Sequence, residues 1–318
     1  MTRLLSRAVF VFLASMLLPL AAHAQAFRAY LASYGSDANP CTIGQPCRLL
    51  PAAINAVATG GEVWILDSAN FNGGTVNIAK SVSILVVPGQ IGSIVAVNGA
   101  PAITITANVS VGLRNVVIAG NAVNPGNHGI VASAGTLLSI EDSLFANLLQ
   151  NGIVAQNSTV RVDIKNTVFR NNGGFAVIAS NGPVVQIADS RLLGNAGGGV
   201  KAMGGASNTT TVINVSDSTI SGGLEGALAS TTNSDAWASI MVTRSTIHDT
   251  CNALHADATA AAGAGKPSVI VTNSTVTNNL VGLLQSGTTA VTVVKSLGNN
   301  YIGDNGSETG TLTTTPLR

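Results

Sequence analysis

Charged and aromatic residues are scarce in this 318-residue chain, at 9% and 4% of the sequence. The 15 basic residues nearly balance the 14 acidic ones, so the chain offers no basic surface for nucleic acid or for an anionic membrane. Hydrophobic residues nevertheless make up 46% of the sequence, which excludes disorder, because disordered chains combine low hydrophobicity with high net charge. The composition therefore predicts a folded protein without a nucleic-acid partner.

Several motifs that mark catalytic sites are absent as well. The chain contains no His-x-x-x-His zinc motif, no phosphate-binding loop, no nucleophile elbow and no basic strip with interleaved aromatic residues. No reaction can therefore be assigned from a motif.

Long apolar runs are confined to the N-terminus. Arg3 and Arg7 give a basic start, residues 8–20 are apolar, and residues 22–24 form a small-x-small cleavage site. No later stretch approaches the roughly 20 apolar residues that span a bilayer. We therefore expect residues 1–24 to be an export signal and the mature protein to be secreted or periplasmic, with no membrane span.

Only three cysteines occur in the chain. Cys41 and Cys47 bracket five residues, and in an oxidising compartment we expect them to close a small disulfide loop. A metal-binding pair is the alternative, although no histidine or second cysteine pair lies nearby in sequence. Cys251 is left over, and we expect it to be a small buried residue.

Most of the chain consists of a repeat. A polar residue, usually Asn or Asp, is followed in most copies by Ser or Thr, and the copies lie 22 to 29 residues apart. Three and five residues before the second member of each pair the side chain is apolar, as on the buried face of a strand. Repetition at this period predicts a solenoid, in which one unit is stacked many times. The pairs are Asn115-Val116, Asp142-Ser143, Asn166-Thr167, Asp189-Ser190, Asp217-Ser218, Arg244-Ser245, Asn273-Ser274 and Lys295-Ser296.

Two more short strands follow each pair. The alternation of apolar positions breaks at the pair, so the chain must bend there, and a Gly-aliphatic dipeptide such as Gly129-Ile130 usually opens a third strand. Three short strands and three bends describe one coil of a right-handed single-stranded parallel β-helix, in which like residues stack about 4.8 Å apart. We therefore expect an all-β, monomeric fold of about ten coils over residues 62–318.

Residues 25–61 form a lead-in to the repeats. Within it Pro51 suits the first turn of a short amphipathic helix, and the glycines at positions 60–61 stop that helix. A stack of strands exposes unpaired backbone groups at its end. We expect the helix to cover the N-terminal end of the stack.

The sequence also carries a family resemblance. The Asn-Pro-Cys…Pro-Cys lead-in, the cap helix, the Gly-Gly-Glu-Val-Trp-Ile-Leu-Asp segment and the Ile-x-Asp-Ser-x-Phe-x-x-Asn…Gly-Ile coils resemble secreted bacterial right-handed β-helix repeat proteins of the pectate-lyase-like superfamily. The resemblance implies the fold over nearly the whole mature chain. Members include polysaccharide lyases and hydrolases and surface adhesins. The aspartate clusters of pectinolytic members are not recognisable here, so no catalytic residue is carried over.

The polar residues of the pairs have two interpretations. Asn and Asp tolerate bends and bond their own backbone, which predicts a structural corner. The alternative is a calcium site at Asp189 and Asp217, which should be neighbours, but calcium prefers six to eight oxygen ligands. Calcium is the one cofactor that the sequence suggests.

A second set of candidates lies on the outward side of the first strand. Arg114, Glu141 and Lys165 should stack in successive coils, with Asp163 alongside. Opposite charges one strand apart predict an ion-pair ladder. Alternatively, the column binds an acidic sugar and supplies a base for β-elimination.

A third set lies on the outward side of the third strand. Lys201, Leu228, His255 and Leu284 should form one column, and Asp257 should point the same way as His255. Insertions at residues 204–210, 231–236 and 258–266 lie at one corner and predict a cleft wall. Trp237 begins the next strand, where its ring could stack on a sugar or merely cover an apolar edge.

Three functions remain open at this point. We expect a binding or structural role toward an extracellular or envelope polysaccharide. The first alternative is a polysaccharide lyase or glycoside hydrolase whose catalytic candidates are Lys201, His255 and Asp257. The second alternative is a surface adhesin.

Overall fold

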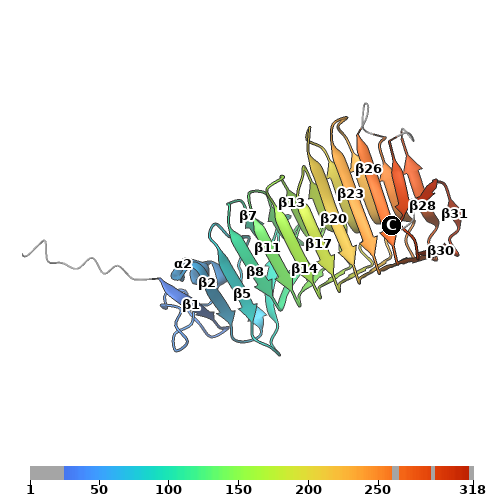
Figure 1. Ribbon diagram of the computed structural model, residues 1–318. Coiled ribbons are helices and arrows are strands. Elements are labelled where there is room, and N and C mark those ends of the chain that lie inside the picture. Colours follow the sequence, from blue (N-terminus) through green and yellow to red (C-terminus); the bar gives the residue numbers. More distant parts are fainter. Residues whose placement is uncertain (1–24, 260–264, 288–290, 315–318) are drawn as a thin grey trace, which may run out of the picture.

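The computed structural model describes residues 25–259, 265–287 and 291–314, and the expected export signal at residues 1–24 lies outside this part of the chain. Within it the strands wind into an elongated β-helix whose coils build three parallel sheets (Figure 1). The predicted all-β fold of about ten coils, with three strands in a coil, is confirmed.

The three sheets of the described residues contain 12, 10 and 10 strands, and we number them in the order in which each coil visits them. Sheet 1 contains β1 (Ala26–Leu31), β2 (Val57–Ile65), β5 (Val82–Val86), β8 (Ser110–Arg114), β11 (Leu137–Glu141), β14 (Arg161–Lys165), β17 (Val184–Ala188), β20 (Thr210–Ser216), β23 (Trp237–Thr243), β26 (Lys266–Thr272), β29 (Val293–Ser296) and β32 (Leu312–Thr314). Sheet 2 contains β3 (Ala69–Asn70), β6 (Gly92–Ala96), β9 (Val116–Gly120), β12 (Leu144–Ala146), β15 (Val168–Arg170), β18 (Arg191–Leu193), β21 (Thr219–Ser221), β24 (Thr246–His248), β27 (Thr275–Thr277) and β30 (Tyr301–Gly303). Sheet 3 contains β4 (Val76–Asn77), β7 (Ile103–Ile105), β10 (Ile130–Ala132), β13 (Ile153–Gln156), β16 (Phe175–Ser180), β19 (Gly198–Gly204), β22 (Glu225–Thr231), β25 (Asn252–Asp257), β28 (Val281–Ser286) and β31 (Ser307–Glu308).

The core consists of vertical files of equivalent side chains. Ile140 pairs with Ile164 and Ile164 with Ile187 in the register of sheet 1, and all three are buried. In sheet 2, the rings of Phe145 and Phe169 stack with their centroids 4.7 Å apart. Apolar residues at alternate positions therefore face inward in every coil, as the period of two predicts.

The corner between sheets 1 and 2 explains the polar member of each repeat pair. Seven of these polar residues have positive φ angles, between 45° and 57°: Asn115, Asp142, Asn166, Asp189, Asp217, Arg244 and Asn273. Asn and Asp enter this left-handed region more readily than other residues with a side chain. The predicted bend at these seven positions is therefore confirmed.

The last predicted pair, Lys295-Ser296, is wrong. Lys295 pairs with Ile270 inside sheet 1, whereas Asn299, with a φ of 53°, turns the corner of this coil. Ser296 follows an apolar run and so imitates the repeat in sequence. The bend itself, however, requires a left-handed residue, and Asn adopts that conformation more easily than Lys.

The second member of each pair carries an internal hydrogen-bond ladder. In each case a buried Ser or Thr hydroxyl accepts a hydrogen bond from a backbone N–H group of the preceding coil. The same hydroxyl donates a hydrogen bond to the backbone carbonyl two residues earlier in its own coil. A bend that leaves the sheets would otherwise bury unpaired backbone groups. The residues of the ladder are Ser143, Thr167, Ser190, Ser218, Ser245 and Ser274.

The N-terminal end is built from a helix and an additional strand. Helix α2 (Leu50–Ala56) buries Leu50, Ala53 and Ile54 at the end of the stack, as expected for a cap (Figure 1). It ends four residues before the glycines at 60–61, because Val57 is already extended and begins β2. Those glycines instead lie at an irregularity where β1 pairs with β2, and a Cβ at Gly61 would come within 2.3 Å of the Phe27 carbonyl oxygen.

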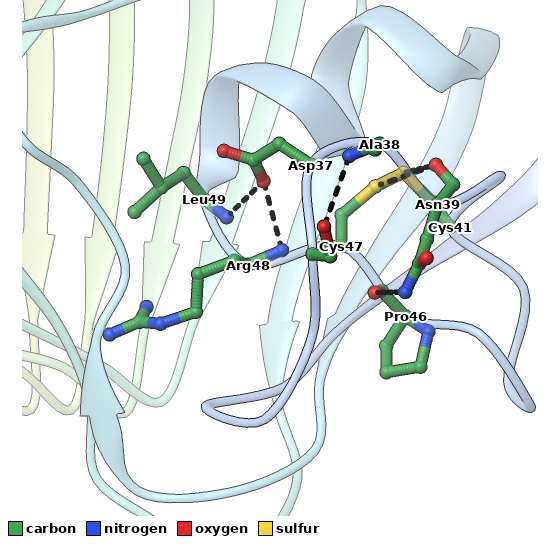
Figure 2. Close-up of a disulfide and its surroundings, with 9 residues drawn as sticks. Asp37, Ala38, Asn39, Cys41, Pro46, Cys47, Arg48 and Leu49 are labelled. Atoms are coloured by element: carbon green, nitrogen blue, oxygen red, sulfur yellow. Dashed lines mark hydrogen bonds between the residues drawn. A yellow bond between two sulfur atoms is a disulfide. The ribbon is translucent and has the colours of Figure 1, made fainter.

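The predicted disulfide between Cys41 and Cys47 is present, and both cysteines are buried (Figure 2). Asp37 supports the loop, since one carboxylate oxygen accepts hydrogen bonds from the backbone N–H groups of Arg48 and Leu49, at 2.9 and 2.8 Å. Cys251 is free and only partly buried, so its predicted burial is wrong, because it lies at an outer bend rather than on an inward file. Among the described residues, no helix is long and apolar enough to cross a bilayer.

Candidate functional site

A groove on the outward face of sheet 1 contains two of the predicted site residues, Arg114 and Glu141. One outward column of this sheet runs across β2, β5, β8 and β11. The residues that pair in register along it are Trp64, Leu85, Arg114 and Glu141. The next column holds the small residues Ser83, Gly112 and Ser139. The result is a hollow of about 340 Å³, which we call the Trp64 groove. Its lining consists of Glu62, Trp64, Ser83, Ile84, Leu85, Gly112, Leu113, Arg114, Ser139 and Glu141.

At the N-terminal end of the Trp64 groove, Glu62 accepts hydrogen bonds from two neighbouring side chains. One oxygen of Glu62 accepts from Arg28 Nε and Nη2, at 2.9 and 2.6 Å, and from Trp64 Nε1, at 2.9 Å. The Arg28 guanidinium also lies 4.3 Å from the centre of the Trp64 ring. These donors, Arg28 first and then Trp64, hold the pKa of Glu62 below its usual value. Glu62 is therefore an ionised acceptor that fixes the orientation of the indole.

The other end of the Trp64 groove contains the predicted charged column. Arg114 Nε lies 3.1 Å from Asp142 Oδ2 and 3.9 Å from Glu141 Oε2. Asn166 donates to the other oxygen of Asp142 at 2.8 Å, and this bond, followed by that of Arg114, lowers the pKa of Asp142.

The predicted ladder of ion pairs is only half formed. Lys165 follows Glu141 in the register, but the described residues contain no ion pair of Lys165 within 4.0 Å. A second hollow, of about 400 Å³, continues from Arg114 and Glu141 past Lys165 to Asp189. Polar and charged groups therefore extend the Trp64 groove along the β-helix.

On sheet 3 the predicted column is present, and it contains a buried polar network. The register aligns Lys201, Leu228, His255 and Leu284 on β19, β22, β25 and β28. His255 is only 9% exposed. Its Nδ1 lies 3.2 Å from both carboxylate oxygens of Glu225, and its Nε2 lies 2.8 Å from the hydroxyl of Ser286.

The network joins side chains from three successive coils. Ser286 donates its single proton to Asp257, at 2.7 Å. Nε2 of His255 therefore shares a hydrogen bond with a hydroxyl that already donates elsewhere, and Nδ1 shares one with the carboxyl group of Glu225.

The environment of Asp257 favours its ionised form. Burial alone would raise the pKa of Asp257, but hydrogen bonds from the side chain and backbone of Thr259 and from Ser286, together with the charge of His255, lower it below its usual value. Lys201 takes no part, since its ammonium lies 5.7 Å from the ring of Phe175 and Leu228 separates it from His255. The sequence thus indicated two members of the network and missed Glu225 and Ser286.

This network is better suited to structure than to proton transfer. Both nitrogens of His255 are occupied and the ring is covered, so a substrate has little access to either. The lyase or hydrolase centre expected at Lys201, His255 and Asp257 stays a prediction.

Trp237 lies on sheet 1, at the beginning of β23. Its side chain is 50% exposed, and the ammonium of Lys266 lies 4.6 Å from its ring centre. Both residues line a hollow of about 260 Å³ together with Pro267, Ser268 and Val293. The loops at residues 205–209 and 232–236 lie at the corner before sheet 1, as predicted, whereas residues 260–264 of the third loop lie outside the described part.

The predicted calcium ligands lie at consecutive corners. Asp189 and Asp217 turn adjacent coils, but both oxygens of Asp217 accept hydrogen bonds from Arg244, at 2.7 and 2.6 Å. In the part of the chain that the structure describes, no three His, Cys, Asp or Glu side chains gather as a metal site would need. Calcium binding stays a prediction.

Comparison with known proteins agrees with this architecture. A family model for the right-handed β-helix region matches residues 63–216 and 101–264, and the chain belongs to this family. No curated protein matches the chain in sequence.

Several solved structures are similar to the chain in fold. XylC in complex with xylose has a TM-score of 0.63 at 8% identity, over 91% of this chain and 70% of that one. The pectate lyase Pel9A has a TM-score of 0.60 at 14% identity, over 91% and 77%. The GH136 lacto-N-biosidase from Eubacterium ramulus has a TM-score of 0.50 at 12% identity, over 91% and 68%. At these identities the similarity shows the shared fold alone.

Proposed function

We propose that the protein is a secreted or periplasmic monomer that binds an extracellular or envelope polysaccharide in the Trp64 groove. The observation that carries the proposal is the pairing of an oriented indole at one end with Arg114 and Glu141 at the other, over a floor of small residues. A sugar ring has apolar C–H faces and polar hydroxyl edges. The indole suits the former, and the charged side chains can donate to and accept from the latter.

The geometry of the Trp64 groove favours binding over hydrolysis. Its two lining carboxylates, Glu62 and Glu141, lie on β2 and β11, which are three strand spacings apart. At about 4.8 Å per spacing this is about 14 Å. Glycoside hydrolysis needs carboxyl groups about 5–9.5 Å apart. Glu62 is also held ionised, so it is poorly suited to act as a general acid.

The structural neighbours support a saccharide ligand in general terms. They include a protein solved with xylose, a pectate lyase and a lacto-N-biosidase. The buried disulfide is compatible with an oxidising compartment.

Retention on gels that contain different polysaccharides tests the proposal. We expect the protein to be retarded by at least one polymer and Arg114→Ala to weaken the affinity by about 10-fold or more, since hydrogen bonds to charged groups contribute about 1.5–3 kcal/mol. The matched control is Arg170→Ala, an exposed arginine on sheet 2 that should bind normally.

Two outcomes would contradict the proposal. Release of unsaturated or reducing ends during incubation would identify a lyase or hydrolase instead. Failure of every polymer to retard the protein would overturn carbohydrate binding and leave the adhesin or a purely structural role.

A further inference from the structure

The two tryptophans of the chain share an unusual setting. The sequence contains only Trp64 and Trp237, and both project from the outward side of sheet 1. Each ring is accompanied by a cation, Arg28 at 4.3 Å and Lys266 at 4.6 Å. Each also lines a hollow, of about 340 and 260 Å³ respectively. Two sites of similar construction therefore lie on one face.

The register gives the distance between the two sites. Trp64 is on β2 and Trp237 on β23, which are seven strand spacings apart, or about 34 Å along the β-helix. The column of Trp64 reaches Thr243 on β23, six residues beyond Trp237, which adds a lateral displacement of about 20 Å. The two indoles are therefore about 40 Å apart, too far for one small sugar to contact both.

A column of polar side chains crosses the surface between the two sites and ends at Met241 on β23, with Val184 and Val212 beside it on the side of Trp237. Figure 1 shows the strands from β5 to β20 side by side, without a loop crossing this face. Asp163, Gln186 and Asn214 continue the outward column of Gly112 and Ser139, and they present carboxylate and amide groups at the surface. A sugar chain that lies along this column finds partners for its hydroxyl groups.

We propose that the hollow around Trp237 is a second carbohydrate subsite, which binds the same polysaccharide chain as the Trp64 groove. This inference rests on the function proposed above. A chain that occupies both subsites binds the second one intramolecularly, so its affinity can exceed that of either subsite by a factor of about 10²–10⁴. A fragment shorter than the separation of the indoles gains nothing from the second subsite.

A length series of the retained polysaccharide tests this inference. We expect the polymer to bind at least about 10-fold more tightly than size-fractionated short fragments. Trp237→Ala should abolish this gain and leave the affinity of the Trp64 groove for short fragments, measured from the emission of Trp64, unchanged. The control is Tyr301→Ala, which removes an exposed aromatic ring from sheet 2 and should keep the gain.

Fluorescence gives an independent readout, because each single-tryptophan variant reports one subsite. In Trp237→Phe the emission of Trp64 should change with short fragments and with polymer. In Trp64→Phe the emission of Trp237 should change when polymer or fragments occupy the second subsite.

The outcomes separate the two proposals. If Trp237→Ala binds the polymer as tightly as the parent protein while Arg114→Ala does not, the second subsite is wrong and the Trp64 groove stands. If the parent protein binds no polysaccharide, both proposals fall.

Discussion

At the scale of single residues, the hydroxyl ladder shows how a stacked fold provides hydrogen-bond partners for the buried backbone groups at its bends. Ser218 accepts a hydrogen bond from the N–H of Ser190 at 3.0 Å and donates to the carbonyl of Ser216 at 2.6 Å. All of this takes place in the interior, where water cannot replace a missing partner. A hydroxyl at this position therefore contributes more than its small size suggests.

We predict that Ser218→Ala lowers the free energy of unfolding by about 1–3 kcal/mol, because it leaves the buried N–H of Ser190 without an acceptor. Urea denaturation followed by circular dichroism measures the loss. Ser221→Ala, on the outward side of β21, is the control and should change stability little. Equal effects of the two substitutions would contradict the role of the ladder.

Arg244 shows the limit of sequence reasoning at this scale. It turns a corner with a φ of 45°, although arginine has no intrinsic preference for that conformation. Its two hydrogen bonds to Asp217 hold it there and lower the pKa of Asp217. The repeat predicted its position correctly, whereas Lys295 was misplaced because Ser296 imitates the pattern and Asn299 makes the bend.

At the scale of strands and coils, stability is local, since each coil packs only on its neighbours. The stacked rings of Phe145 and Phe169 are fully buried on β12 and β15. The stacked phenylalanine rings therefore bury more apolar surface between these two coils than smaller side chains would.

We predict that Phe145→Ala destabilises the protein by about 3–5 kcal/mol, through lost burial and the cavity left behind. Hydrogen exchange measured by mass spectrometry should rise most in the coils that contain β9, β12 and β15. Phe27→Ala, at a side chain that is 61% exposed, should have little effect. Uniform exchange along the whole β-helix would show that the coils do not unfold locally.

The strands were predictable because their buried face repeats with period two, but the partners within the sites were not. Glu225 and Ser286 meet His255 from the coils before and after it, and each lies diagonally to it in the register. Arg28 reaches Trp64 only because β1 joins the edge of sheet 1. These contacts depend on side-chain direction across strands, which a one-dimensional pattern does not contain.

At the scale of the whole molecule, several carboxylates are more acidic in the folded state than in the unfolded chain. Hydrogen bonds lower the pKa values of Glu62, Asp142, Asp217 and Asp257. A lowered folded pKa contributes stability above the unfolded value and loses it as the pH falls through the folded value. Stability should therefore decline below about pH 4, where unfolded carboxylates titrate.

We predict that Asp257→Asn lowers the melting temperature at pH 7 and that this difference shrinks as the pH falls below about 4, because the unfolded chain then binds the proton and the folded protein binds it as well once the pH passes its lowered pKa. Thermal denaturation at a series of pH values measures the difference. Asp235→Asn, in an exposed loop, should match the parent protein throughout. A difference that stays constant down to the lowest pH would show that the charge of Asp257 is unimportant.

Because the β-helix is built from whole coils, distances along the outward face of sheet 1 change only in steps of one strand spacing. Because equivalent residues recur at every winding, deletion or duplication of the coil that begins with β14 or with β17 would move Trp237 relative to Trp64 by one increment of about 4.8 Å. Neither hollow would change its own residues. If the two hollows bind one glycan as proposed, the length of glycan that spans them is reset in fixed steps while the residues of each hollow stay the same.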